Sequence, residues 1–66
     1  MSNEWISVKD RLPEPLKDVF CTFNNGGYEP KIVDRTWMFH DGSWLYEEIY
    51  GKVTHWMPIP EPAEDD

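Results

Sequence analysis

Val53-Thr54-His55-Trp56-Met57-Pro58-Ile59-Pro60 is the stretch of this sequence that decides the fold. Residues alternate along it, with Val53 and Met57 on one face of an extended backbone and Trp56 on the other, so both faces carry large side chains. Such a strand is expected at the centre of a sheet. The two prolines lack the amide donor that a sheet ladder needs, so regular pairing is expected to end at about Met57.

Two further strands are predicted upstream of this stretch. Residues 19–23, Val-Phe-Cys-Thr-Phe, consist of strand formers, and the following Asn24-Asn25-Gly26-Gly27 tolerates the positive φ angles of a turn. Residues 28–39 then alternate in a second strand. The pattern predicts a hairpin or short loop between the two.

Another strand is predicted between residue 43 and the final strand. His40-Asp41-Gly42-Ser43 carries the Asp-Gly pair that type I′ hairpin turns favour, and Trp44-Leu45-Tyr46 begins a strand. Its outer end, residues 47–50, is more polar, as suits an edge that must not recruit neighbours. Gly51 and Lys52 turn the chain into the last strand.

The N-terminal part predicts an anchor rather than a helix. Trp5 to Val8 alternate in a short β-like pattern, and the prolines at 13 and 15 force extended or turn geometry. We expect at most one helical turn, between Pro13 and Asp18. The short connections exclude parallel neighbours. The fold class predicted is therefore mainly β: a small antiparallel sheet, a three- to four-strand meander, with an N-terminal extended anchor.

Length and composition indicate one small β domain, residues 1–60, followed by an acidic tail, residues 61–66. A chain this short buries only ~60% of the surface that its unfolded form exposes. Cys21 is the single cysteine, so no disulfide forms within the chain, and the spacing of two histidines and this cysteine is not that of a zinc site. Aromatic packing and self-association remain as the means of stabilising so short a chain, and this predicts a homo-oligomer.

The charge balance disfavours polyanion partners. Six basic against thirteen acidic side chains give a formal net charge of −7, and four of the acids belong to the tail: Glu61, Glu64, Asp65 and Asp66. No two basic residues are adjacent, so duplex DNA binding is not expected. The tail is expected to be disordered, or alternatively to mimic a polyanion and dock on a basic partner. Without an apolar run long enough for a membrane span, or a leader, a cytoplasmic location is expected.

The sequence shows no constellation typical of an enzyme. The three serines lack a nucleophile elbow, and Glu47 and Glu48 would face opposite sides of a strand. Gly26-Gly27 lacks the context of a phosphate loop. The sequence therefore predicts a non-catalytic protein without a cofactor or a metal.

Several side chains are candidates for binding. Arg35 and Trp37 are two apart in a strand and would share a face, either as a cation–π shelf for a planar ligand or as an Arg lying over a core Trp. His55 is either bonded to a neighbour or a pH-sensitive donor at a ligand pocket or subunit contact. Trp56 is either a core residue or a stacking platform. With four tryptophans in so small a sheet, at least one is expected to be exposed.

Both ends of the chain resemble a known family. Residues 5–14, WISVKDRLPE, and residues 53–62, VTHWMPIPEP, resemble the end signatures of the domain of unknown function 551 family, small proteins common in bacteriophages and prophages. The middle matches more loosely, as strand, turn and strand. The resemblance implies a phage or prophage origin, and small accessory phage proteins frequently counter host defence.

Two functional hypotheses follow from these observations. In the first, a homo-oligomer sequesters a nucleotide-type immune signal in pockets between subunits, stacking the base and neutralising the phosphate; the residues proposed are Arg11, Arg35, Trp37, Trp44, Lys52, His55 and Trp56. In the second, the chain is an acidic inhibitor that occludes a basic, nucleic-acid-binding site on a host defence protein, through the tail residues Glu61, Glu64, Asp65 and Asp66.

Overall fold

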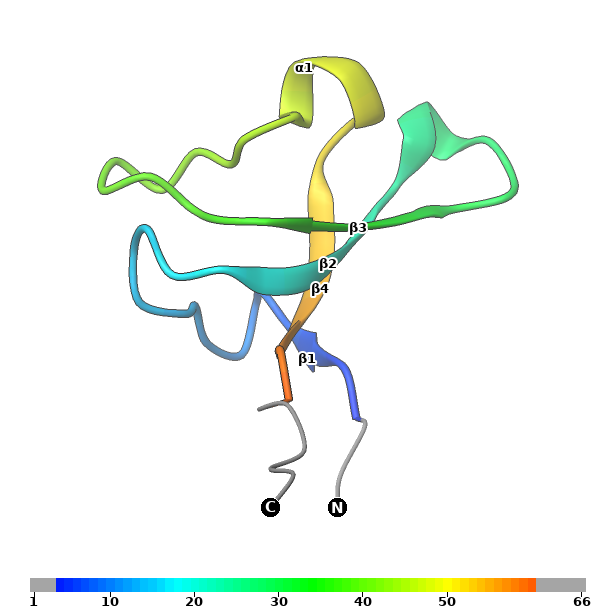
Figure 1. The fold of residues 1–66 in the computed structure, drawn as a ribbon. Helices are drawn as coiled ribbons and strands as arrows, with labels where there is room; N and C mark the ends of the chain where they lie inside the picture. Colours follow the sequence, from blue (N-terminus) through cyan, green and yellow to red (C-terminus); the bar gives the residue numbers. More distant parts are fainter. Residues whose placement is uncertain (1–3, 61–66) are drawn as a thin grey trace, which may run out of the picture.

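The fold is one antiparallel sheet with a single irregular layer over one of its faces (Figure 1). The computed structural model describes residues 4–60. The four strands are ordered β1-β4-β2-β3. Their bounds are β1 Ile6–Ser7, β2 Val19–Phe23, β3 Ile32–Thr36 and β4 Val53–Pro58. The predicted mainly β, antiparallel fold with an N-terminal extended anchor is confirmed.

β4 occupies the central position that its sequence predicts. It pairs with β1 on one side, where Ile6 is opposite Trp56, and with β2 on the other, where Val19 is opposite Pro58. The ladder thus extends one residue beyond the end expected at Met57. β2 and β3 form a hairpin, whereas β4 returns beside β2 rather than beside its sequence neighbour β3, so the predicted meander order of the strands is wrong.

A β-bulge in β4 corrects the expected facing of its side chains. Thr22 is opposite His55 but Phe23 is opposite Val53, so Thr54 is the extra residue on β4. Because of this insertion Val53 and Trp56, three residues apart, are both buried on the same face of the sheet. The strict alternation predicted for residues 53–57 is therefore wrong at Thr54.

The core lies between this face and residues 37–50. β2 contributes Val19, Cys21 and Phe23, and the covering segment contributes Met38, Trp44 and the half-buried Tyr50. The ring of Tyr50 packs edge-on against Phe23, with centroids 5.2 Å apart. Large aromatic side chains thus fill a core that has only one sheet to build on.

The strand predicted at residues 44–50 is wrong at its outer end, which is the helix α1 (Glu47–Tyr50). Two bonds explain the difference: the Glu47 carboxylate accepts the Trp44 amide at 3.0 Å, and its carbonyl accepts the Gly51 amide at 3.0 Å. Trp44 itself makes only an isolated bridge to Met38. Between Pro13 and Asp18, where at most one helical turn is expected, the chain forms no helix. No helix in residues 4–60 is long and apolar enough to cross a membrane.

β3 is shorter than the strand predicted at residues 28–39, and both turns differ in detail. Pairing begins only at Ile32, which is opposite Phe23, the last residue of β2. The 3₁₀ turn η1 (Asn25–Gly27) occupies the predicted first turn. In the 40–43 turn only Gly42 has a positive φ, whereas type I′ needs two such residues. The Ser43 amide and hydroxyl donate to the Asp41 carboxylate, which lowers the pKa of that carboxyl.

Asn24 joins the β2–β3 turn to the start of β4. Its side-chain oxygen accepts hydrogen bonds from the backbone amides of Gly26 at 3.0 Å and Lys52 at 3.1 Å. The backbone amide of Asn24 donates to the Lys52 carbonyl at 2.8 Å. Gly51 passes directly over this oxygen, with φ +89°. A Cβ on Gly51 would overlap the Asn24 oxygen, so only glycine fits.

We predict that Gly51→Ala destabilises the protein far more than Gly42→Ala. Both glycines have φ near +90°, but a Cβ on Gly42 meets nothing within 4 Å. Gly42→Ala should therefore cost only the backbone strain, about 1–2 kcal/mol, while Gly51→Ala adds the overlap with Asn24. Urea denaturation of both variants measures the difference. Equal losses would show that the Asn24 junction does not constrain residue 51.

We also predict that Cys21 is chemically inert in the folded protein. Burial raises the pKa of its thiol to about 12, so the folded state keeps the proton to higher pH than the unfolded state. Stability should be unaffected by this group below the unfolded pKa of about 9 and should fall as pH rises from there toward 12. A thiol reagent at pH 8 should label the protein only in denaturant. Rapid labelling without denaturant would contradict the burial of β2.

Candidate functional site

Arg11 and Trp56, two of the binding residues proposed from sequence, lie together although they are 45 residues apart. The guanidinium carbon of Arg11 is 5.7 Å from the centroid of the Trp56 ring, in a cation–π arrangement. The indole nitrogen of Trp56 donates to the Arg11 carbonyl at 2.9 Å. The indole is thereby fixed to the backbone of residue 11 while the Arg11 side chain covers one of its faces.

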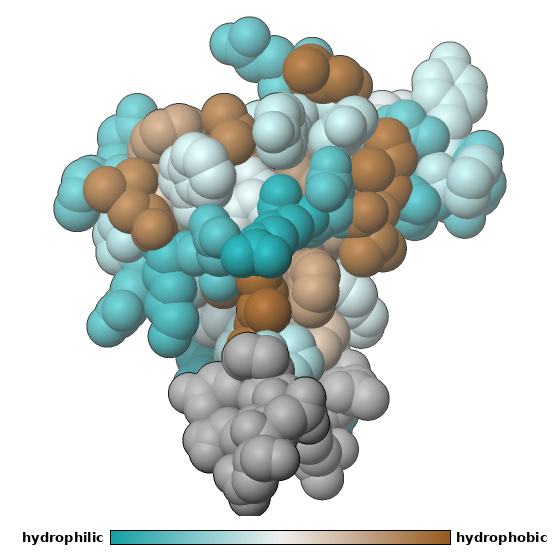
Figure 2. All heavy atoms as spheres, in the orientation of Figure 1, coloured by the Kyte–Doolittle hydropathy of each residue, from teal (hydrophilic) through white to brown (hydrophobic). Residues whose placement is uncertain are grey.

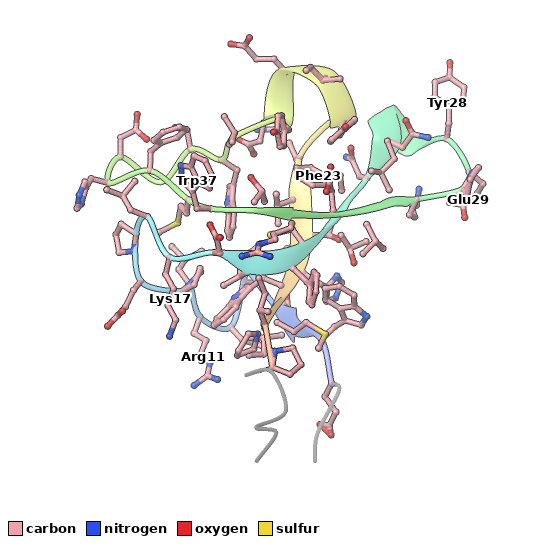
Figure 3. All side chains as sticks on the ribbon, in the orientation of Figure 1. Arg11, Lys17, Phe23, Tyr28, Glu29 and Trp37 are labelled. Atoms are coloured by element: carbon pink, nitrogen blue, oxygen red, sulfur yellow. The ribbon has the colours of Figure 1, made fainter. Side chains whose placement is uncertain are left out.

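A pocket of about 270 Å³ opens beside this pair. It lies between the end of β4 and the loop of residues 11–17, which we call the proline loop, and we call the pocket the Arg11 pocket. Its lining residues are Arg11, Leu12, Pro13, Glu14, Lys17, Val19, Trp56 and Pro58. Figure 3 shows the side chains of Arg11 and Lys17 extending from the proline loop in the same direction.

The electrostatics of the Arg11 pocket favour an anion. Among residues 4–60 the ion pairs are Lys31 with Glu29 and Arg35 with Asp18, so neither Arg11 nor Lys17 is neutralised by a partner there. Glu14 is the one acid in the lining. Trp56 is only 6% exposed, so it serves as an aromatic floor under Arg11 rather than as an open stacking platform.

Arg35 and Trp37 lie away from this pocket. The Nη2 and Nε atoms of Arg35 donate to one carboxylate oxygen of Asp18, at 2.9 and 3.1 Å. Trp37 follows the end of β3, is half-buried, and contacts the edge of Phe39 with ring centroids 6.5 Å apart. The guanidinium of Arg35 is therefore committed to Asp18 on the adjacent strand end.

Trp44 belongs to a second hollow, of about 490 Å³, which we call the α1 groove. Trp44 is buried at its floor, and the other lining residues are Phe39, Ser43, Leu45, Tyr46, Glu47, Glu48 and Ile49. This groove contains acidic and apolar side chains and no lysine or arginine. It suits an apolar or cationic group better than a phosphate.

His55 and Lys52 occupy two further places. His55 lies on the sheet face opposite the core, half-buried, with Nδ1 2.9 Å from the Thr54 hydroxyl. Lys52 is exposed at the start of β4, beside Asn24. The proposed tail residues Glu61, Glu64, Asp65 and Asp66 lie outside the described residues. In one chain, the residues proposed for nucleotide binding are thus distributed over several surfaces rather than gathered in one pocket.

Two residues of interest were not proposed from the sequence. Lys17 lines the same pocket as Arg11 because the proline loop folds back. In the sequence, a lysine three residues after Glu14 does not indicate that position. Trp5 is 40% exposed and is the tryptophan that satisfies the expectation of an exposed indole. No group of three or more His, Cys, Asp or Glu side chains placed to hold a metal occurs in the described part of the chain.

Comparison with known proteins gives one match. The family model described as "Protein of unknown function (DUF551)" matches residues 4–64, nearly the whole chain. No curated protein and no solved structure matches.

We predict that Trp56→Phe loosens the proline loop. The variant keeps an aromatic ring in the core but removes the donor to the Arg11 carbonyl, at an expected cost of about 1–3 kcal/mol. Amide exchange of residues 11–17 should accelerate more than that of β2. Trp5→Phe, at an exposed indole, is the matched control and should change stability by about 0.5 kcal/mol or less. Unchanged exchange in the loop would mean that the Trp56 bond does not hold it.

Proposed function

This chain belongs to the DUF551 family, and we propose that it is a non-catalytic phage or prophage accessory protein that sequesters a nucleotide-type immune signal. The observation that carries the proposal is the Arg11 pocket. Residues 4–60 contain six basic and nine acidic side chains, yet two of the cations converge on one pocket without an ion-pair partner in that part of the chain. A phosphate between Arg11 and Lys17 would supply the missing negative charge.

The rest of the lining supports a ligand with a planar apolar part. Leu12, Pro13, Val19 and Pro58 provide apolar surface next to the two cations, and Trp56 lies beneath Arg11. A base can therefore pack on the apolar wall while its phosphate reaches Arg11 and Lys17. The volume of about 270 Å³ is just below the usual range for a small-molecule site, so part of a nucleotide would protrude. A second subunit over the pocket would bury that part, in keeping with the proposed homo-oligomer.

Binding rather than turnover is favoured by the side chains present. The lining contains no Ser, Thr, Cys or His, so no nucleophile with an adjacent base faces the proposed ligand. Glu14 alone lacks a partner acid or base for paired proton transfer. A protein of this kind would act in the host cytoplasm by lowering the free concentration of the signal, which requires tight binding and stoichiometric amounts.

A second candidate function rests on the acidic side chains of the chain and not on the cations of the Arg11 pocket. The whole chain has a net charge of −7, and residues 37–51 contain Asp41, Glu47 and Glu48 without any lysine or arginine. An acidic chain with exposed apolar side chains next to its acids is suited to a basic protein surface. In this alternative the protein occludes a basic, nucleic-acid-binding site on a host defence protein, with residues 61–66 contributing additional charge.

We predict that a cyclic or ADP-ribose-type nucleotide raises the thermal stability of the purified protein. A ligand present at 100 times its Kd adds about 2.7 kcal/mol, equivalent to a rise in Tm of roughly 10–20 °C for a chain of this size. Arg11→Gln should weaken binding about tenfold or more, because one charge-assisted contact is worth about 1.5–3 kcal/mol. Tryptophan fluorescence gives an independent titration.

The control is Lys31→Gln. Lys31 is paired with Glu29, which Figure 3 shows at the far side of the molecule from Arg11, so this variant removes a cation of equal charge without touching the pocket. If Arg11→Gln and Lys31→Gln lose the same nucleotide affinity, the loss reflects the overall charge of the protein and not a contact in the Arg11 pocket. If no cyclic or ADP-ribose-type nucleotide shifts Tm, the first function is wrong. A host protein that is then captured by the full chain, but not after removal of residues 61–66, would identify the second.

A further inference from the structure

The α1 groove presents apolar side chains to solvent beside a row of acids. Ile49 is 72% exposed, and Phe39 and Tyr46 are also exposed at the rim. Glu47 and Glu48 lie on the same short helix. Figure 2 shows brown, apolar surface above α1 and along the edge where the 39–43 turn lies. A partner for this surface needs an aliphatic side chain flanked by a cation.

The proline loop of the same chain has that chemistry. Leu16 is 55% exposed and is followed directly by the exposed Lys17, and the exposed Leu12 follows Arg11 in the same way. The proline loop thus displays leucines next to cations, and the α1 groove displays an apolar hollow next to carboxylates. The two surfaces are complementary in both charge and hydrophobicity.

Backbone geometry sets both surfaces apart from the rest of the molecule. In the described chain the non-glycine residues with positive φ are Leu16 at +65°, Tyr46 at +76° and Asn25. Asn tolerates this conformation, whereas bulky residues rarely adopt it. Leu16 is 55% and Tyr46 39% exposed, so neither side chain is fully buried in its own subunit. One lies in the proline loop and the other in the α1 groove.

The two surfaces adjoin where the proline loop meets the segment that covers the sheet. The Leu16 amide donates to the Met38 carbonyl at 2.7 Å, and the next residue, Phe39, lines the α1 groove. Two copies related by a two-fold axis can therefore exchange both contacts at once, which closes the assembly at a dimer.

The sheet edges are less suited to self-association. On β3 the Arg35 amide is bonded by the Asp34 carboxylate at 2.7 Å, which occupies a donor that a neighbouring strand would need. On the other edge β1 has only two residues, Ile6 and Ser7. Two copies are therefore expected to associate through side-chain surfaces and not by pairing strands across a sheet edge.

We propose that the occupant of the α1 groove is the proline loop of a second copy of this chain. Leu16 of each copy enters the groove of the other beside Tyr46 and Ile49, and Lys17 faces Glu48 of the second copy. The inference goes beyond nucleotide binding, because Leu16 and Ile49 do not line the Arg11 pocket. In the dimer Glu48 of the second copy neutralises Lys17, so the dimer contact and a bound phosphate compete for Lys17, and Arg11 is the cation of the pocket that stays unpaired among residues 4–60.

The test is the mass in solution, by light scattering and sedimentation equilibrium. The wild-type chain should approach 15.8 kDa, twice its 7.9 kDa, as concentration rises. Leu16→Asn removes the apolar anchor but places at residue 16 a side chain that tolerates positive φ, so it should fold at least as well and remain at 7.9 kDa. Ile49→Ser should weaken the dimer about tenfold, the effect of losing one buried anchor.

Two further variants make the assignment specific. Val33→Thr changes an exposed apolar residue on β3, outside both surfaces, and should leave the dimer intact. Lys17→Glu and Glu48→Lys should each weaken the dimer, and the double variant should recover it. A wild-type chain that stays monomeric at millimolar concentration, a Leu16→Asn dimer as tight as wild type, or a double variant that fails to recover overturns the proposal. Nucleotide binding by monomeric Leu16→Asn would leave the proposed function standing.

Discussion

The insertion of β4 between β1 and β2 is the constraint on which the rest of the structure depends. Because β1 and β2 lie on opposite sides of β4, the chain between them must cross that strand (Figure 1), and the bond between Trp56 and Arg11 places the crossing near the end of β4. The crossing segment contains the proline loop, and the end that it crosses carries Trp56 and Pro58. The Arg11 pocket is thus a consequence of strand order. The hydrogen bond from the Trp56 indole to the Arg11 carbonyl holds the crossing segment at the level of Trp56 on β4.

A second consequence concerns the core. A sheet this small needs a cover on one face, and the cover here is a segment with only one turn of helix, α1. It is held on the sheet by its core side chains Met38, Trp44 and Tyr50 and by the hydrogen bond that the Thr36 hydroxyl of β3 donates to the Leu45 carbonyl at 3.0 Å. The bulge at Thr54 matters equally, since it turns Val53 and Trp56 toward the same cover. Irregular segments of this kind leave bulky side chains such as Ile49 in solvent.

The sequence predicted those features that depend on local pattern. The two-sided composition of residues 53–57 identified the central strand, and residues 19–23 gave a second strand at its observed bounds. The strand at residues 44–50 was wrong because its aromatic residues suggested β structure, while the helix is set by Glu47 and Gly51, a capping acid and a terminating glycine. Those two residues were a signal available in the sequence. The bulge had none, because it depends on how β4 meets β2.

The candidate site was predictable in its components and not in its assembly. Arg11 and Trp56 were both proposed as binding residues, but a side-chain pair separated by 45 positions becomes a pair only through the strand order. Arg35 shows the opposite case: it carries the same charge and was proposed for the same role, yet the neighbouring strand end supplies Asp18 and removes it from the set of available cations. Charge type can be read from sequence, whereas charge availability depends on the fold.

This distinction explains how a chain with a net charge of −7 can present a cationic pocket. Binding depends on the local field, and over a distance of about 8–10 Å in physiological salt the distant acids are largely screened. The acids of α1 are on the other hollow, lined by a different set of residues, and Glu14 is the one acid of the Arg11 lining. Among residues 4–60, the lining that an anion meets in the Arg11 pocket therefore holds two cations and one carboxylate, and the net charge of the chain affects mainly the rate of its approach.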